Sequence, residues 1–488
     1  MKDKAVKSAA ANDPADLNRR KFVRGVGTGA LALGGSNVLL ASTTAGKKPE
    51  LSSRFPDCDV DVVVVGGGFA GVTAARDCRE NGFSTLILEA RNRLGGRTFT
   101  TEFEGHTIEL GGAWIHWSQP FIWAEKERYG LEIIETPGFA PDKMLIRIDG
   151  EVRELDEADI YSVMEGFRTY TAAARTIFER PYDARHNWDS VLQADKISAR
   201  EHLDSLDLSP LQKTAMDSFL AGNAHNTSDT LSYYDSLRWT SLAGYNDLLL
   251  WMDAVGRFKF RHGTAALIDK MIADGEPEVR LQTPVSKVQN LGDRVRVTTQ
   301  GGDTITAAAA VIALPMNVLG DLAFEPALAS GLIEAAQERH TGLGIKLYIR
   351  VKGDIGKVFM MADSSNRLNN IFTYHQAPDH SVLVAFGADP AAIDMYDEQA
   401  VQDALREFLP GIEVQSTFGY DWVLDPYSKG TYASYRPGWM ERYYAEFQRD
   451  HGRLFFAQGD HGDGWRGFID GAIAAGAKAA DRIANSLG

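Results

Sequence analysis

A mainly apolar, β-branched run from Val60 to Val65 precedes a glycine-rich turn, and a stretch of helical pattern then continues to Asn81. A short apolar run between turn signals is typical of a strand buried in a parallel sheet. Gly82 ends the helical stretch, and a second apolar run follows at Ser84 to Leu88. The pattern therefore predicts a strand, a helix and a second strand over residues 60–88.

Helical and strand periodicities divide the remainder of the chain. Helices dominate from Leu155 to about Trp251, and Ser209 followed by Pro210 marks a helix start there. Strand patterns return near Phe258 and then alternate with helices. The expected strands are 131–148 (several short ones), 279–281, 285–289, 295–299, 310–314, 345–351, 381–386, 413–420 and 454–457, and further helices are expected at 119–129 and from Gly263, Glu398 and Gly471.

The order of these elements predicts an α/β fold, with a Rossmann-like dinucleotide-binding domain interleaved with a second domain of mixed sheet and helices. With 488 residues and 44% hydrophobic content, the chain is long enough for two domains with substantial cores. We expect the dinucleotide-binding domain to comprise residues 57–137, 252–325 and 440–488. The second, substrate-binding domain is expected to comprise residues 138–251 and 326–439.

The first 45 residues have the pattern of a targeting segment. Asn18 to Arg24 contains adjacent arginines and precedes a glycine-rich, mildly apolar stretch from Gly25 to Ser42. This arrangement resembles a twin-arginine export signal, which implies a periplasmic protein that is exported in its folded state. The apolar stretch is too short and too rich in glycine to span a membrane, so no stable membrane insertion is expected. A basic, disordered tail is the alternative.

Charge and cysteine content narrow the function classes. The formal net charge of −15 and the lack of a basic stripe argue against nucleic-acid binding, which needs clustered lysine and arginine. Two cysteines are present, Cys58 and Cys78, so the sequence excludes a disulfide framework and a Cys-rich metal site. We expect both thiols to be unpaired, and we expect no metal site, because no H-E-x-x-H motif occurs either.

The turn after the first strand carries the pattern Gly66-x-Gly68-x-x-Gly71. Between a strand and a helix, the first glycine allows a tight turn, the second lets a diphosphate approach the backbone, and the third lets the helix touch the strand. The helix N-terminus then faces the diphosphate with unpaired N–H groups. Glu89, at the end of the second strand, is placed to accept hydrogen bonds from a ribose. Together these residues predict a dinucleotide site.

Two further segments, Arg91 to Thr98 and Glu109 to Trp114, offer additional close backbone approaches to such a ligand. In this order, the motifs resemble those of the flavin-dependent amine oxidase family. Two matches in the last third of the chain, Tyr420 to Tyr432 and Gly464 to Ala472, extend the resemblance to residues 57–488. The FAD contacts that it implies are Gly66, Gly68, Phe69, Ala70, Gly71, Glu89, Ala90, Arg91, Gly96, Arg97, Gly111, Gly112, Ala113, Trp114, Val285, Trp422, Gly459, Asp460, Phe468 and Ile469.

The resemblance also implies three catalytic residues. Tyr432 and Phe468 match the two aromatic side chains that flank the amine in front of the flavin, and Lys346 matches the lysine that holds a water against flavin N5. As isolated residues, the aromatics would be core residues and Lys346 an exposed lysine of an edge strand. Thr431 stands where some members carry a cysteine bonded to the flavin, so non-covalent FAD is expected. Asp460 replaces a glutamate of the family pattern, and Phe468 replaces a tyrosine.

The family's chemistry is oxidation of an unprotonated amine, which gives a hydride from its α-carbon to flavin N5 and leaves an imine that hydrolyses to an aldehyde or ketone. Gly111 to Trp117 and Asn223 to Asn226 are most similar to bacterial nicotine and pseudooxynicotine amine oxidases, which implies a secondary or N-heterocyclic amine. O2 or a cytochrome-type protein is the expected electron acceptor. One alternative is an enzyme of the same fold that oxidises a primary monoamine, a polyamine or an L-amino acid. The other is a binding protein in which FAD is structural. The protein could also form a homodimer.

Six other side chains lie near the two ends of the helical segment and are candidates for lining a substrate pocket. Histidines and aromatics in such positions more often pack structurally, and this is the favoured interpretation for each of them. They are His116, Trp117, Asn223, His225, Trp239 and Tyr245.

Overall fold

The structure is a computed structural model that describes residues 52–488, all of which lie in one compact unit spanning residues 50–488. The predicted export signal at residues 1–45 lies outside the described residues, and its function stays a prediction. Within residues 52–488, no helix is both long and apolar enough to cross a membrane. Cys58 and Cys78 both lie in the described part and are free thiols, which confirms that they are unpaired.

An eight-stranded sheet forms the half that the sequence predicts to bind a dinucleotide. Its parallel centre is strand β1, which is buried at every position and pairs with β2 on one side and β13 on the other. The strand, helix and strand predicted at residues 60–88 are therefore confirmed. The strand order is β10 (Glu278–Arg280), β2 (Thr85–Leu88), β1 (Val60–Val65), β13 (Thr304–Ile312), β12 (Val295–Thr299), β11 (Val285–Asn290) and β14 (Ala323–Glu325), with β20 (Leu454–Phe456) also paired to β13.

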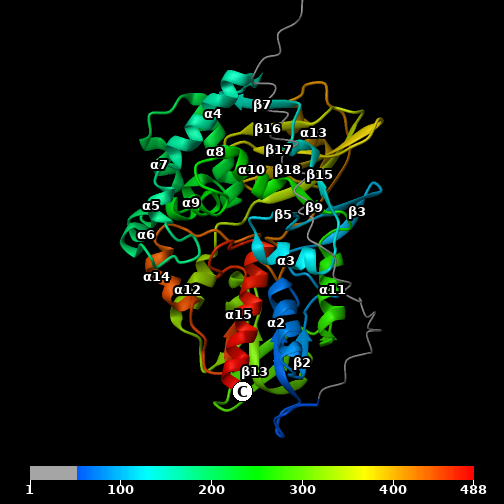
Figure 1. Cartoon of the computed structure of the whole chain (residues 1–488). Helices are drawn as coiled ribbons and strands as arrows, with labels where there is room; N and C mark the ends of the chain where they lie inside the picture. Colours follow the sequence, from blue (N-terminus) through cyan, green and yellow to red (C-terminus); the bar gives the residue numbers. More distant parts are fainter. Residues whose placement is uncertain (1–51) are drawn as a thin grey trace, which may run out of the picture. The chain divides into compact units, whose positions relative to one another are not determined.

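Helices α2 (Phe69–Glu80), α11 (Ala265–Gly275) and α15 (Ile469–Leu487) pack side by side against this sheet (Figure 1). Their apolar positions form one core with the inward side chains of β1 and β13. Gly476 of α15 faces the backbone of α2 so closely that a Cβ atom would collide with the carbonyl oxygen of Ala70. The first and last helices of the described chain are therefore in close backbone contact.

A seven-stranded sheet forms the other half. Its first-half strand β7 pairs with β8 on one side and with β16, which follows residue 340, on the other, so the two halves of the chain are interleaved. The sequence pattern does not predict two of its strands, β16 and β17, individually. The order is β19 (Val414–Gly419), β15 (Ile345–Lys352), β18 (His380–Gly387), β17 (Asn370–Gln376), β16 (Val358–Ala362), β7 (Lys143–Ile148) and β8 (Glu151–Glu154).

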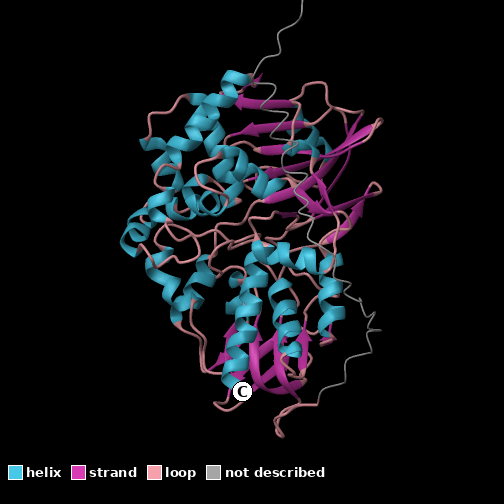
Figure 2. Ribbon diagram, viewed as in Figure 1, coloured by secondary structure: helices cyan, strands magenta, loops and turns pink. Residues whose placement is uncertain are grey.

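Helices cover one side of the seven-stranded sheet (Figure 2), and α13 (Glu398–Arg406) contributes to the core on its other side. Helix α8 starts where the sequence predicts, because the Ser209 side chain accepts a hydrogen bond from the Gln212 N–H and Pro210 occupies the first turn. The covering helices are α4 (Glu157–Tyr170), α5 (Ala174–Ile177), α6 (Trp188–Asp195), α7 (Ala199–Ser205), α8 (Pro210–Ala224), α9 (Tyr233–Leu242) and α10 (Leu248–Gly256).

Two small sheets are separate from the large ones in the strand pairing. They are β3 (Thr100–Phe103) with β4 (His106–Glu109), and β5 (Trp114–Ile115) with β9 (Phe258–Phe260) and β6 (Ile133–Glu135). The remaining helices are α3 (Pro120–Arg128), α12 (Ser330–Glu338) and α14 (Trp439–Phe447).

Most differences from the predicted elements are of one or two residues at element ends, where patterns are least informative. Strand β13 differs more, because it begins at Thr304 and ends at Ile312, whereas the pattern predicts a strand at 310–314. Its alanines do not have the β-branched character of a typical strand, and burial between β1 and β12 stabilises it instead. The domain boundaries stay a prediction.

Candidate functional site

The turn between β1 and α2 forms a cradle for a diphosphate. Gly66 has φ of +105°, a conformation that glycine adopts without strain. Gly68 caps α2 without a side-chain hydrogen bond, so the first N–H groups of the helix stay available to an anion. A Cβ atom on Gly71 would collide with the Gly66 carbonyl oxygen, so the third glycine is needed for helix–strand contact. The roles predicted for the three glycines agree with this geometry.

Glu89 is buried beside this turn. One carboxylate oxygen accepts the Gly67 N–H at 2.7 Å, and the other accepts the Arg91 N–H at 2.8 Å. Each oxygen retains a lone pair for a second donor such as a ribose hydroxyl. Gly95 bridges to the same turn, since its N–H donates to the Gly67 carbonyl at 2.8 Å. The two glycine segments thus form one continuous surface.

A cavity of about 580 Å³ extends from this cradle to the seven-stranded sheet. Its volume lies in the range of ordinary cofactor and substrate sites. Of the residues predicted to contact FAD, all line the cavity except Gly71 and Asp460. Gly71 faces the β1 turn from inside α2, as described above. The predicted catalytic residues Lys346, Tyr432 and Phe468 all line it as well.

Asp460, one of the predicted FAD contacts, does not line the cavity. Its carboxylate is fully buried, pairs with the Arg97 guanidinium and accepts the Met316 N–H at 2.9 Å. Arg97 in turn donates to the Thr431 carbonyl at 2.6 Å and lines the cavity. The Asp460 carboxylate is therefore linked to the cavity through Arg97. Arg91 is held similarly, by Asp425.

Tyr432, Phe468 and Trp239 form an aromatic cage. The Trp239 ring lies 4.8 Å from Phe468 in an edge-to-face contact and 5.9 Å from Tyr432. The Tyr432 hydroxyl donates to the Gly222 carbonyl, so its ring face rather than its polar end is free to contact a ligand. His225 stacks on the other side of Tyr432 with a ring separation of 5.1 Å. Trp239 and His225 both line the cavity and are also packed against protein partners, so each is a candidate pocket residue as well as a packed one.

The hydrogen bonds of His225 define its tautomer. Nε2 lies 3.0 Å from the Ile345 carbonyl, which can only accept, so Nε2 carries the proton and Nδ1 accepts from the Thr431 hydroxyl at 2.8 Å. Burial lowers the pKa of His225 to about 4. The imidazole is therefore neutral at physiological pH and presents an uncharged ring to Tyr432.

Lys346 is a buried interior residue. Its strand β15 pairs with β18 on one side and β19 on the other, so the alternative of an exposed edge lysine is wrong. Nζ donates to the carbonyl oxygens of Glu109 and Gly111 at 2.6 and 2.8 Å. Burial lowers the pKa of Lys346 to about 7, and the Glu109 carboxylate opposes that shift. One N–H of the ammonium form is left for another acceptor.

The end of the cavity beside the cage is apolar. We call it the aromatic end. None of the described residues that form it carries a carboxylate or a guanidinium. Asn370 is its polar member, and its amide exchanges hydrogen bonds with Ser218. The aromatic end consists of Phe139, Phe219, Trp239, Trp251, Met252, Val255, Phe359, Asn370, Phe372, Phe386, Tyr432 and Phe468.

Most of the aromatic end was missed by sequence reasoning. Its residues come from β16, β17, β18, α8 and α10, where an aromatic residue facing a cavity has the same local pattern as one facing a core. Four residues considered earlier do not line the cavity: His116, Trp117, Asn223 and Tyr245. For His116, Asn223 and Tyr245 the packing interpretation is confirmed, since each bonds to protein partners. Trp117 is instead half exposed.

Comparison with known proteins identifies the family. A family model described as flavin containing amine oxidoreductase matches residues 69–484. The chain is 43% identical to a pseudooxynicotine dehydrogenase of Pseudomonas sp, with 98% of each chain covered. It is 35% identical to a nicotine dehydrogenase of Pseudomonas putida, with 96% of this chain and 98% of the relative covered.

Solved structures of similar fold include a putrescine oxidase bound to putrescine, at 22% identity and a TM-score of 0.74 over 87% of this chain and 98% of the other. A cyclohexylamine oxidase from Brevibacterium oxydans gives 19% identity and a TM-score of 0.73 over 88% and 99%. These likenesses confirm the predicted fold class. The glycine cradle, the buried glutamate and the aromatic cage fit the flavin that the family model names. The chain belongs to the flavin-containing amine oxidoreductase family.

Proposed function

We propose that this protein is an FAD-dependent oxidoreductase for a secondary or N-heterocyclic amine of the nicotine or pseudooxynicotine type. The observation that carries the proposal is the aromatic end of the cavity, which includes the cage of Tyr432, Trp239 and Phe468. None of its residues carries a carboxylate or a guanidinium, and Lys346 lies beside it. Such a surface binds a flat, uncharged heterocycle by ring contacts and excludes water. The named relatives act on molecules of this type.

FAD, when bound, supplies the two-electron acceptor that takes a hydride from the α-carbon of the amine. The chain's own residues orient the amine and keep it unprotonated. Ring faces of Tyr432 and Phe468 hold the amine between them, and the apolar surroundings favour its neutral form, which alone has the electron pair needed to form an imine. Lys346 donates to the Glu109 and Gly111 carbonyls. We propose that its remaining N–H holds a water that hydrolyses the imine.

The alternative substrates fit this cavity less well. A polyamine carries a second cation, which would need a carboxylate in the aromatic end, and none of the described lining residues there is acidic. An amino acid carries a carboxylate, which would need an arginine. The two arginines near the cage in sequence are engaged elsewhere: Arg436 donates to the Arg339 carbonyl, and Arg466 pairs with Asp235. A primary monoamine remains the second candidate.

FAD is proposed to be non-covalent because Thr431 has no sulfur to form a thioether. Its hydroxyl bonds His225, which gives the side chain a structural role in the cage. We further propose export to the periplasm, from the adjacent Arg19 and Arg20, and transfer of the electrons to O2 or a cytochrome-type protein.

Anaerobic mixing of the flavin-loaded protein with a panel of amines tests the function. Nicotine, pseudooxynicotine, a primary monoamine, a diamine and an amino acid are compared by the loss of flavin absorbance. We expect rapid bleaching by the heterocyclic amines and slow or no bleaching by the diamine and the amino acid. Flavin that stays oxidised with every amine would support a binding protein with structural FAD instead. Reoxidation of the bleached protein with O2 and with a cytochrome then identifies the acceptor.

A further inference from the structure

A single buried carboxylate contacts all three segments that carry the aromatic cage. Asp235 lies on α9, one helical turn before Trp239, and is fully buried. Its Oδ2 accepts the Tyr435 N–H at 2.6 Å, three residues after Tyr432. Its Oδ1 accepts from the guanidinium of Arg466, two residues before Phe468.

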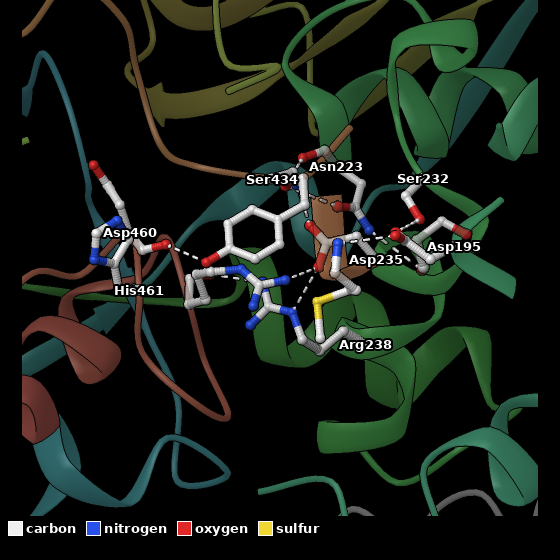
Figure 3. Close-up of polar contacts among 12 residues, drawn as sticks. Asp195, Asn223, Ser232, Asp235, Arg238, Ser434, Asp460 and His461 are labelled. Atoms are coloured by element: carbon white, nitrogen blue, oxygen red, sulfur yellow. Dashed lines mark hydrogen bonds and ion pairs between the residues drawn. The ribbon is translucent and has the colours of Figure 1, made fainter. Parts of the chain in front are cut away.

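Two buried arginines complete this arrangement. Arg238 donates through Nε to Asp235 at 3.0 Å, and its two terminal nitrogens donate to the Gly464 and Arg466 carbonyls, the latter at 3.1 Å. The Arg466 guanidinium lies 3.4 Å from the centre of the Tyr435 ring. Figure 3 shows Asp235 and Arg238 together with the neighbouring Asp460 and His461. Both arginines thus hold the loop that precedes Phe468.

The same network reaches the flavin side of the cavity. The Tyr435 hydroxyl donates to the Asp460 carbonyl at 2.9 Å, and the Asp460 carboxylate pairs with Arg97, which lines the cavity. The Gly467 N–H donates to the Gly459 carbonyl at 2.9 Å, which closes the loop between these positions. A shift of Asp235 or its arginines would therefore move Phe468 and Asp460 together.

We propose that Asp235, Arg238 and Arg466 are positioning residues that fix the spacing of Trp239, Tyr432 and Phe468 around the substrate amine. The inference rests on the proposed function of the cage. The three cage residues come from segments 193 and 36 residues apart in the chain, and no regular secondary structure joins them. A charge-assisted network with fixed guanidinium geometry supplies that connection in a buried, low-dielectric place. Cage spacing decides how well the reacting C–H bond is aligned.

Arg238→Lys tests the proposal. Lysine keeps the positive charge beside Asp235 but lacks the planar fork, so it cannot bond Asp235, Gly464 and Arg466 at once. We expect the rate of flavin reduction by saturating amine to fall about tenfold or more, with FAD content unchanged. The affinity for a non-oxidisable aromatic amine, measured from the perturbation of the flavin absorbance, should fall as well. Arg466→Lys should have the same effects and provides the second variant if Arg238→Lys does not fold.

Asp195→Asn is the matched control. Asp195 is a buried carboxylate of the same region. It accepts from the Ser232 hydroxyl, at the N-cap of α9, and from the Met440 N–H, but its carboxylate bonds neither Arg238 nor Arg466. Its variant should reduce flavin within about twofold of the parent rate. Unchanged reduction rate and ligand affinity in both lysine variants would overturn the proposal. The proposal would also be overturned if Asp195→Asn lost as much of the flavin reduction rate as the lysine variants and its melting temperature fell by as much. That result would indicate general destabilisation.

Tyr432→Ala separates this inference from the proposed function. If removal of the ring leaves amine oxidation unchanged, the cage is not the substrate site and the proposed function fails. If Tyr432→Ala impairs flavin reduction but neither lysine variant does, the cage role stands and the positioning role is wrong.

Discussion

Individual polar side chains around the cage direct their hydrogen bonds into the protein. Tyr432 donates to the Gly222 carbonyl, Asn370 bonds Ser218, and His225 uses both ring nitrogens. Each of these side chains therefore presents ring or alkyl surface to the cavity. Lys346 differs, because it retains a donor in its ammonium form beside two backbone carbonyls. This contrast makes Lys346 the most informative single residue to change.

Lys346→Met should chiefly slow flavin reoxidation or imine hydrolysis, because hydride transfer from a neutral amine needs no acid at this position. A loss of about tenfold corresponds to about 1.4 kcal/mol, the size of one well-placed polar contact. Rapid-mixing absorbance measures the reductive and oxidative half-reactions separately, and product release is followed in parallel. Lys352→Met, on the exposed end of β15, is the control. Unchanged reoxidation and product release in Lys346→Met would refute its assigned role.

His461 should make the protein sensitive to acid. It is buried, stacks on Phe447 at 4.3 Å, and neither ring nitrogen has a hydrogen-bond partner among the described residues. Burial lowers its pKa to about 3, so between pH 6.5 and 3 the unfolded chain binds one more proton than the folded chain. Stability is then fully present above pH 6.5 and falls by at most about 1.4 kcal/mol per pH unit as the pH decreases.

His461→Phe keeps the ring contact and removes this proton uptake. The free energy of unfolding, measured by denaturant titration between pH 7 and 4, should therefore depend less on pH in the variant than in the parent. His262→Phe, at an exposed position, should keep the parent slope. Parallel curves for His461→Phe and the parent would show that His461 does not stay neutral in the folded protein.

Two helices, one from each end of the described chain, support the dinucleotide cradle. Gly476 of α15 lies against the backbone of α2, where a Cβ would meet the Ala70 carbonyl and the Thr73 side chain. Gly476→Ala should therefore push the helices apart and cost about 1 to 3 kcal/mol, as overpacking does elsewhere. Thermal melting and FAD content both report the change. Lys478→Ala, on the exposed face of α15, should leave both unchanged; an equally stable Gly476→Ala variant would contradict the close contact.

The proposed export signal precedes the described residues. Arg19→Lys together with Arg20→Lys should block export and leave flavin-loaded enzyme in the cytoplasm, because the arginine pair is recognised as an address and charge alone does not suffice. Cell fractionation followed by activity assay measures this. Lys21→Arg exchanges one basic residue for another next to the arginine pair and serves as the control. Periplasmic activity that persists in the double variant would refute the export proposal.

For the whole molecule, the cavity joins both large sheets, so the cofactor should stabilise the entire fold. Acid precipitation should release yellow FAD into the supernatant, because Thr431 cannot form the thioether. Readdition of FAD to the refolded or cofactor-depleted protein should raise the melting temperature with concentration, by the equivalent of about 2.7 kcal/mol at 100 times the Kd. FMN, which lacks the adenine half, should stabilise less, since it leaves Glu89 and Val285 without a ligand. A yellow pellet after acid treatment would contradict non-covalent binding.

The sequence by itself determined the features that depend on local backbone chemistry. The glycines of the β1–α2 turn, the helix start at Ser209 and Pro210, and the buried strand β1 follow from steric and hydrogen-bonding rules that act over a few residues. The family motifs also indicated Lys346, Tyr432 and Phe468, and all three line the cavity. Local pattern and family resemblance were sufficient here because each motif specifies its own backbone geometry.

Only the tertiary structure decided how distant segments meet. The alanine-rich strand β13 is stabilised by its neighbours rather than by its own propensity. Residues at least 100 positions away in sequence decide the surroundings of several side chains. They decide whether Trp239 and His225 line a cavity and whether Lys346 is exposed. They also decide whether Asp460 contacts the cavity or Arg97. Burial, pKa and hydrogen-bond partners are properties of the packed environment, and an aromatic or charged residue has the same local pattern in either environment.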